Sequence, residues 1–252
     1  MSQPVVSFHP RTERRLSAAR RVHDLLRSAI IRGELRAGVL PGEAELMVAF
    51  SASRQVVRDA LDLLRREGLV RRLQGTGTLA TSTRVRHDFN FLHGPEQGRV
   101  EHRLLGVSRE VAAPQVAREL GLAAGEECGV VEMLSTLEDE PFYTSTTYVP
   151  AAFLIHAEGL GPHDEWFTIY ERTGIELGTT EHAIEASVAD PFTAALLDVE
   201  EGHPLLLFER VVRDLEGTPL EYAFTQVRGD RLTLQQTLSR RSPDGAWRPA
   251  PG

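Results

Sequence analysis

The stretch that decides the fold is residues 51–70, SASRQVVRDALDLLRREGLV. Apolar side chains recur in it at three- and four-residue spacing, which predicts a helix with one buried face. These apolar residues are Val57, Ala60, Leu61 and Leu64. The first turn instead has polar side chains that can reach phosphates and base edges. They are Ser53, Arg54, Gln55 and Arg58. The stretch therefore predicts a helix with a buried side and an exposed, cationic beginning.

Two further helices are expected before this one. Ser17 is a good helix cap, and an apolar helical periodicity follows it as far as Gly33. A short helix is expected from Glu43 to Phe50, because acidic residues in its first turn suit the helix dipole. This order of helices is that of a helix-turn-helix, whose second element enters the major groove of DNA. A plain three-helix bundle would show the same periodicity.

The residues after the third helix separate these two interpretations. Residues 68–73 predict a strand, residues 74–77 (QGTG) a glycine turn, and residues 78–80 a returning strand. We interpret this hairpin as the wing of a winged helix-turn-helix over residues 17–81, although a plain hairpin turn would also use glycine. Glycine lets the backbone approach DNA closely, and arginine adds charge. The wing residues expected at DNA are Arg71, Arg72, Gly75, Thr76 and Gly77.

The charge of the chain is divided unevenly. The net charge of the 252 residues is -8, yet residues 1–86 have a net charge of +8 and residues 87–252 one of -16. Electrostatic affinity for DNA comes from local neutralisation of phosphates, so a basic module joined to an acidic one fits a DNA-binding protein. The alternative is drift of surface charge without a function.

Composition limits the other classes of protein. The lone Cys128 excludes an internal disulfide and a cysteine zinc site, so we expect neither metal nor cofactor. No apolar run has the length of a membrane span and no signal peptide is visible, so a cytoplasmic protein is expected. Residues 1–16 are expected to be a loose arm, 82–90 a linker between domains, and 242–252 a flexible tail.

Residues 91–241 predict a second domain made mostly of strands. Residues 130–137 and 142–149 are expected to form one hairpin, and residues 204–214 and 219–228 another, with helices at 165–173 and 191–197. Several positions recur later in the chain at a nearly constant offset. The pairs are Pro114 and Pro191, Ala117 and Ala194, Leu120 and Leu197, Gly125 and Gly202, Glu132 and Glu209, and Pro141 and Pro219. Two such units can pair into one antiparallel sheet with a pocket at their seam.

The N-terminal module resembles the GntR family of bacterial transcription regulators. The resemblance covers the predicted winged helix-turn-helix and rests on Gly33-Glu34-Leu35, Leu40-Pro41 with Glu43 and Glu45-Leu46, Ser53-Arg54, Val57-Arg58, Ala60-Leu61, Glu67 to Val70 and Gln74 to Thr78. It implies that the polar first turn of the third helix contacts the operator and that the wing tip contacts the minor groove or backbone. Gly42, Ala44 and Ser51 depart from the family pattern, and Ala44 replaces an arginine that faces DNA.

The C-terminal module resembles the UTRA effector domain of the HutC-like GntR subfamily, which has the fold of chorismate lyase. The resemblance rests on Asp139-Glu140-Pro141, Tyr148-Val149-Pro150, Trp166-Phe167 with Gly174-Ile175, Gly202 with Pro204 to Leu206, and Gly217 to Tyr222 with Arg228 to Arg231. The fold class expected is therefore α+β, a winged helix-turn-helix followed by an antiparallel sheet with flanking helices. The resemblance implies effector contacts at Met133, Ser135, Ser145, Glu165, Phe167, Glu221, Ala223 and Val227.

The residues at these positions change the expected effector. Family members often hold a phosphosugar with two strand arginines, and here those positions are Met133 and Ser135. A phosphate needs guanidinium groups or backbone donors, and Glu165 beside Glu221 would repel an anion. We therefore expect a neutral or cationic effector that is not a phosphosugar. The alternative is that Glu165 is solvated and the pocket has lost its ligand.

The sequence favours a ligand-responsive transcription factor, most simply a repressor. A homodimer is expected, because two winged helices can read a palindromic operator in double-stranded DNA. No membrane partner is expected. The alternatives are an enzyme of the chorismate lyase-like fold fused to a DNA-binding domain, and a constitutive DNA-binding protein without effector. No catalytic triad, paired-histidine metal helix or phosphate-binding glycine loop supports an enzyme, and fold alone does not imply activity.

Overall fold

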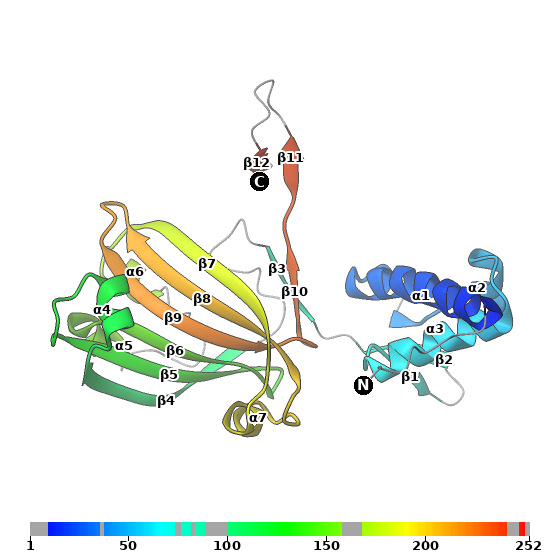
Figure 1. Cartoon of the computed structure of the whole chain (residues 1–252), viewed down its shortest axis with the longest axis horizontal. Coiled ribbons are helices and arrows are strands. Elements are labelled where there is room, and N and C mark those ends of the chain that lie inside the picture. Colours follow the sequence, from blue (N-terminus) through cyan, green and yellow to red (C-terminus); the bar gives the residue numbers. More distant parts are fainter. Residues whose placement is uncertain are drawn as a thin grey trace, which may run out of the picture. The chain divides into compact units, whose positions relative to one another are not determined.

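The chain divides into two compact units, Met1–Arg84 and Val85–Gly252 (Figure 1). Each unit is described by itself. The computed structural model describes residues 10–35, 38–73, 77–81, 84–88, 100–157, 168–240 and 247–249.

The N-terminal unit is a winged helix-turn-helix. It contains the helices α1 (Pro10–Ile31), α2 (Glu43–Ala49) and α3 (Arg54–Arg66), followed by the strands β1 (Val70–Leu73) and β2 (Gly77–Ala80). The two strands pair antiparallel, and a bridge from Val39 to Leu79 ties the chain before α2 to the hairpin. The predicted order of three helices and a two-stranded wing is therefore confirmed.

Helix α3 forms around the apolar stripe that its sequence predicts. Val57, Ala60 and Leu64 have no exposed surface, and Leu61 exposes 3%. The hydroxyl of Ser53 accepts a hydrogen bond from the amide of Val56 at 3.4 Å and caps the helix. One core holds all three helices, with residues from α1, α2 and α3 and from the start of the wing.

The beginning of α1 differs from the prediction. We predicted a loose arm over residues 1–16 and a helix from Ser17, but α1 begins at Pro10. Proline is favoured at the first helical position, and the residues after it are good helix formers. The guanidinium of Arg15 also lies 3.2 Å from the carboxylate of Asp59 on α3. Residues 1–9 lie outside the described residues.

The C-terminal unit is built on one six-stranded antiparallel sheet (Figure 1). The strand order is β4-β5-β6-β9-β8-β7. The bounds are Val100–Val111 for β4, Glu127–Leu137 for β5, Glu140–Pro150 for β6, Leu177–Val188 for β7, Pro204–Asp214 for β8 and Pro219–Arg228 for β9. The two predicted hairpins, β5-β6 and β8-β9, are confirmed.

Helices cover both faces of this sheet. Helices α4 (Pro114–Leu120) and α7 (Pro191–Leu197) pack on one face through apolar clusters with β5 and β8. The other face packs against η2 (Ala151–Phe153), α5 (Leu154–Ala157) and α6 (Thr168–Arg172). Within the described residues, no helix is long and apolar enough to cross a membrane.

The internal repeat predicted from sequence is present in the fold. Strand β4, helix α4 and strand β5 begin at positions 100, 114 and 127, and β7, α7 and β8 begin at positions 177, 191 and 204, each shifted by the same offset. The two copies meet where β6 pairs with β9, so the predicted joining of two units into one antiparallel sheet is confirmed. The structure adds a strand before each helix that the sequence did not predict.

Strands also form in segments that we predicted to be linker and tail. Strand β3 (Val85–Asp88) lies within the predicted linker 82–90 and pairs in parallel with β10 (Leu232–Gln235). Strand β12 (Trp247–Pro249) lies within the predicted tail and pairs with β11 (Leu238–Arg240). Val85 packs in an apolar cluster with Val227 and Leu232, and this burial explains why the segment is ordered.

Candidate DNA-binding and effector sites

The predicted DNA-contacting residues of α3 are all exposed, while the opposite side of the helix is core. Besides the helix-capping bond of Ser53, two of them have side-chain partners within the unit. The side-chain amide of Gln55 donates to a carboxylate oxygen of Asp59 at 2.8 Å, and the Nε of Arg58 donates to Glu43 on α2 at 3.1 Å. Arg54 is exposed in the same turn. This turn can thus offer guanidinium, amide and hydroxyl groups to a duplex.

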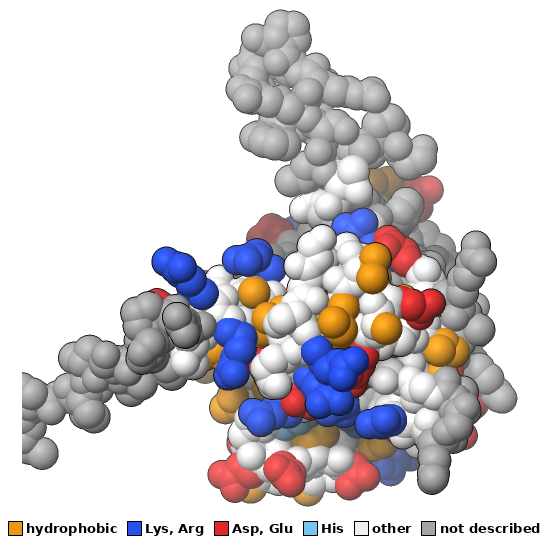
Figure 2. Space-filling view, turned by 90° about the vertical axis from the view of Figure 1, so that its right-hand side faces the viewer, with side chains coloured by type: hydrophobic (Ala, Val, Ile, Leu, Met, Phe, Trp, Pro, Cys, Tyr) orange, Lys and Arg blue, Asp and Glu red, His pale blue; other side chains and the backbone are white. Residues whose placement is uncertain are grey.

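The wing adds cationic groups beside the helix. Arg71 and Arg72 are exposed on β1, opposite Leu79 and Thr78 of β2. Gly77 has a φ of +106°, a backbone conformation that side chains other than glycine rarely adopt. Figure 2 shows arginine side chains distributed over one face of the molecule. The predicted contacts Gly75 and Thr76 lie outside the described residues.

The sheet register places the described effector positions on one face. Met133 pairs with Ser145, which pairs with Thr225, and Ser135 pairs with Tyr143, which pairs with Val227. Cross-strand partners point to the same side of a sheet, and alternate residues of one strand do as well. The predicted positions on this face, which we call the effector face, are Met133, Ser135, Ser145, Glu221, Ala223 and Val227. Glu165 and Phe167 lie outside the described residues.

A buried ion pair lies on the effector face. Arg210 of β8 pairs in register with Ala223, and its side chain reaches Glu221 of β9. The Nε of Arg210 donates to Oε1 of Glu221 at 2.8 Å, and a second guanidinium nitrogen contacts the same oxygen. Glu221 has no exposed surface, whereas the Arg210 side chain exposes 20%. The hydroxyl of Tyr170 on α6 lies 3.5 Å from the other oxygen of Glu221.

Histidines lie on the two edge strands of the effector face. His182 of β7 pairs in register with Arg210. Partial burial, together with the charge of Arg210 and the neighbouring His87, lowers the pKa of His182 to about 4. His182 is therefore neutral at pH 7. On the other side of the face, a ring nitrogen of His102 lies 2.8 Å from the hydroxyl of Ser135.

Ser145 has an unsatisfied hydroxyl at the centre of the effector face. Its side chain exposes only 6%, and its Oγ has no hydrogen-bond partner among the residues that the structure describes. A buried polar group without a partner costs about 1–3 kcal/mol. Such a group is retained more readily where a ligand supplies the missing bond.

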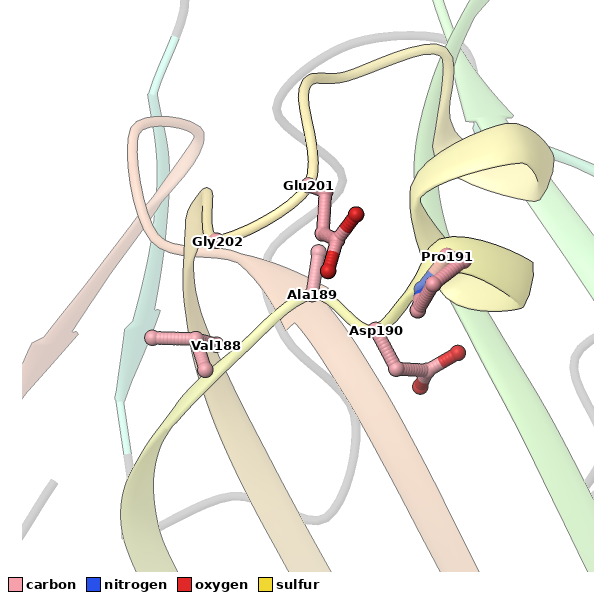
Figure 3. Close-up of a pocket in the computed structure, with 6 residues that line it drawn as sticks. All are labelled: Val188, Ala189, Asp190, Pro191, Glu201 and Gly202. Carbon is pink, nitrogen blue, oxygen red and sulfur yellow. The ribbon is translucent and has the colours of Figure 1, made fainter.

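The structure has a hollow elsewhere on the C-terminal unit. The open pocket in Figure 3 is lined by Val188, Ala189, Asp190, Pro191, Glu201 and Gly202, at the end of β7 and the start of α7. Asp190 is the cap of α7 and accepts hydrogen bonds from the amides of Phe192 and Thr193. The pKa of Asp190 is lowered, mainly by the hydrogen bonds that its carboxylate accepts from Thr193. Loss of hydration has a smaller, opposite effect on this pKa. The pocket shares no lining residue with the effector face, so the predicted pocket at the seam of the repeats is not this one.

Sequence reasoning did not find Arg210 or Tyr170. Arg210 lies in a mostly apolar strand, LLLFERVV, which gave no sign of a functional residue. Its carboxylate partner, Glu221, lies on the neighbouring strand. The repeat contained the signal, because Arg210 follows Met133 by the same offset that separates Pro191 from Pro114. Tyr170 lies on α6, whose packing against β9 could not be inferred from sequence.

Comparison with known proteins decides the family. Residues 18–79 match the family described as bacterial regulatory proteins, gntR family, and residues 96–233 match the UTRA domain. The chain belongs to the GntR family. This GntR protein is 31% identical over 239 residues to an uncharacterized HTH-type transcriptional regulator, RB1450, of Rhizobium meliloti, covering 88% of this chain and 96% of that one.

Two other proteins are similar to this chain over most of its length. The HTH-type transcriptional repressor NagR of Bacillus subtilis is 27% identical over 237 residues, covering 88% of this chain and 94% of NagR. The crystal structure of PhnF from Mycobacterium smegmatis superposes with a TM-score of 0.63 at 24% identity, covering 87% of this chain and all of PhnF. This GntR protein is thus a DNA-binding transcriptional regulator with a UTRA domain and is not an enzyme.

Proposed function

We propose that this GntR regulator is a repressor whose operator binding is controlled by a small molecule on the effector face, and that this molecule is not a phosphosugar. The observation that supports effector binding is the buried, unsatisfied hydroxyl of Ser145 among the predicted effector positions. The name of NagR, a transcriptional repressor, supports the direction of control.

The charges of the effector face support the choice of effector. A phosphate brings a charge of about -2 and needs unpaired cations. Among the described positions of β5, β6, β8 and β9 on this face, the cation is Arg210, and Glu221 neutralises it. Arg109 of β4 lies on the same face by register, and its guanidinium is 3.8 Å from the carboxylate of Glu127. His182 is neutral at pH 7 because its pKa is about 4. An uncharged or cationic polar molecule meets no such penalty.

The operator is read by the exposed first turn of α3 and by the wing. We propose contacts from Ser53, Arg54, Gln55 and Arg58, with the wing residues Arg71, Arg72, Gly75, Thr76 and Gly77 beside them. One winged helix contacts few base pairs, so a homodimer on a palindrome with half-sites about one DNA turn apart is expected. Effector binding then shifts the population between arm orientations that match this spacing and those that do not. Acting on chromosomal DNA, the protein is cytoplasmic.

A ligand screen joined to an operator-binding assay tests this function. The purified full-length protein is heated with panels of uncharged metabolites, amines and phosphorylated sugars, and every stabilising compound is added to the protein–operator complex. We expect stabilisation by an uncharged or cationic compound that also weakens operator binding. Stabilisation by phosphorylated sugars alone would contradict the proposed effector class. A saturating ligand that leaves operator affinity unchanged would contradict the coupling.

A further inference from the structure

One cation of the effector face, Arg210 of β8, lies in the second copy of the internal repeat. The resemblance to UTRA domains places arginines at positions 133 and 135 of β5, and this chain has Met133 and Ser135 there. The offset of the repeat relates Met133 to Arg210 and Ser135 to Val212. The register places Arg210 on the same face as Met133, because Arg210 pairs with Ala223, Ala223 with Thr147, and Thr147 with Val131.

This arginine differs from a phosphate-binding arginine in having an internal counter-ion. Two of its guanidinium nitrogens contact one oxygen of Glu221, and the carboxylate is fully buried. The Arg210 side chain exposes 20% of its surface and the Glu221 side chain none, so Arg210 is the accessible member of the pair. An anion at this guanidinium would therefore face a fixed negative charge directly behind it, in surroundings where charge interactions are only weakly screened.

We propose that Glu221 acts as an anion filter, masking the charge of Arg210 so that the effector face accepts uncharged molecules with hydrogen-bond acceptors and rejects phosphorylated ones. The effector class that fits has hydroxyl or amide carbonyl groups for the guanidinium and a donor or acceptor for the Ser145 hydroxyl. This inference rests on the proposed function, since it takes the effector face as the ligand site.

The filter is tested by removing its charge while keeping its shape. Glu221→Gln leaves a side chain of the same size that still accepts a hydrogen bond from Arg210. Glucose 6-phosphate is the probe, with glucose and inorganic phosphate as references, and the unfolding temperature of the full-length protein is measured. We expect no shift for the wild-type chain. For Glu221→Gln, we expect a rise of roughly 2–5 °C at a concentration about ten times Kd, decreasing in high salt.

Two further variants make the result specific. In the double variant Arg210→Met with Glu221→Gln the cation is absent, so glucose 6-phosphate should not shift the unfolding temperature.

Met133→Arg places a cation without a paired carboxylate on the same face. Glucose 6-phosphate should therefore stabilise the Met133→Arg variant, even if Glu221→Gln fails to fold. A folded Glu221→Gln without any shift would overturn the filter, and so would an equal shift in the double variant. If Glu221→Gln does not fold, an absent shift in Met133→Arg overturns it. A shift in the wild-type chain would instead contradict the proposed effector class.

Discussion

Two arginine–glutamate pairs, one in each unit, have the same chemistry and opposite surroundings. In the DNA-binding unit, Arg58 meets Glu43 with 54% and 36% of the two side chains exposed. In the UTRA domain, Arg210 meets Glu221 with 20% and 0% exposed. An exposed pair contributes about 0–1 kcal/mol and exchanges readily with other partners, whereas a buried pair is costly to break.

The difference suits the two ligands that we propose, DNA and an uncharged effector. DNA supplies a phosphate or a base edge that can replace Glu43 at the guanidinium of Arg58 on the surface. The guanidinium of Arg210 cannot exchange its partner in this way, because Glu221 is buried and would be left as an uncompensated charge. Arg58 is therefore available to an anion because its ion pair is exposed. Arg210 is not available to one, because its partner Glu221 is buried.

Breaking the buried pair should have the largest effect. Arg210→Met leaves the Glu221 carboxylate without its cation, and we expect the UTRA domain to lose about 3–5 kcal/mol of unfolding free energy. Urea denaturation at pH 7 measures this loss. The matched control is Arg210→Met with Glu221→Leu, which removes both charges and should recover most of the stability. Equal losses in the single and double variants would show that packing of Arg210, and not the charge of Glu221, matters.

Removing a guanidinium from the exposed first turn of α3 should have the next largest effect. This change should weaken DNA binding and leave stability unchanged. Arg54→Ala and Arg58→Ala should each cost roughly 1–3 kcal/mol of operator affinity if the contact is bidentate to guanine. Titration of a labelled operator measures the loss. Because both side chains are exposed, the unfolding temperature should not change appreciably. Full operator affinity in both variants would remove these residues from the interface.

Removing the acidic partner of the exposed pair, Glu43, should have a smaller effect on operator affinity, and this effect should be an increase. Glu43→Gln should change stability by no more than about 1 kcal/mol, because the pair is exposed. It should tighten binding to DNA, since it frees Arg58 and removes a negative charge near the phosphates. Operator affinity measured at several salt concentrations tests this. Weaker binding in Glu43→Gln would mean that Glu43 positions Arg58 for its contact.

Titration of His182 beside the buried pair should have the smallest effect. The pKa of His182 is about 4 in the folded chain, against an ordinary 6.5, so between these values the unfolded chain binds a proton that the folded chain does not. Stability should therefore fall as pH decreases from 6.5 to about 4. The residue is only partly buried, on an edge strand, and solvent screening should limit the fall to about 1 kcal/mol or less. His182→Asn should flatten this part of the stability profile, and an unchanged profile would contradict the assignment.

The comparison also shows where sequence reasoning succeeded. Ser53, Arg54 and Arg58 could be placed on one exposed turn because helical periodicity fixes which side of α3 is buried. The internal repeat predicted the joining of two units into one sheet, which the pairing of β6 with β9 confirms. Local patterns and a repeat are sufficient in such cases because the information lies within a few turns or strands.

Sequence reasoning failed where contacts join distant segments. Strand β3 forms because it pairs with β10. In the sequence, β10 comes after all six strands of the large sheet, so the residues of β3 taken alone resembled a linker. The length of α1 was underestimated, because Arg15 meets Asp59 only after α3 has packed against it. Each of these contacts joins residues that are far apart in the sequence, and no local sequence pattern predicts such a contact.

The sequence by itself determined the winged helix-turn-helix, the polar face of α3 and the two hairpins, because each follows from spacing along the chain. The positions of the effector face were predicted from the family resemblance. Only the tertiary structure decided the electrostatics of that face. Arg210 and Glu221 are separated by a hairpin, and their charges cancel because the register of β8 on β9 brings the guanidinium to a carboxylate that the fold has removed from water. Burial is a property of the assembled sheet, and it decides what a charge can bind.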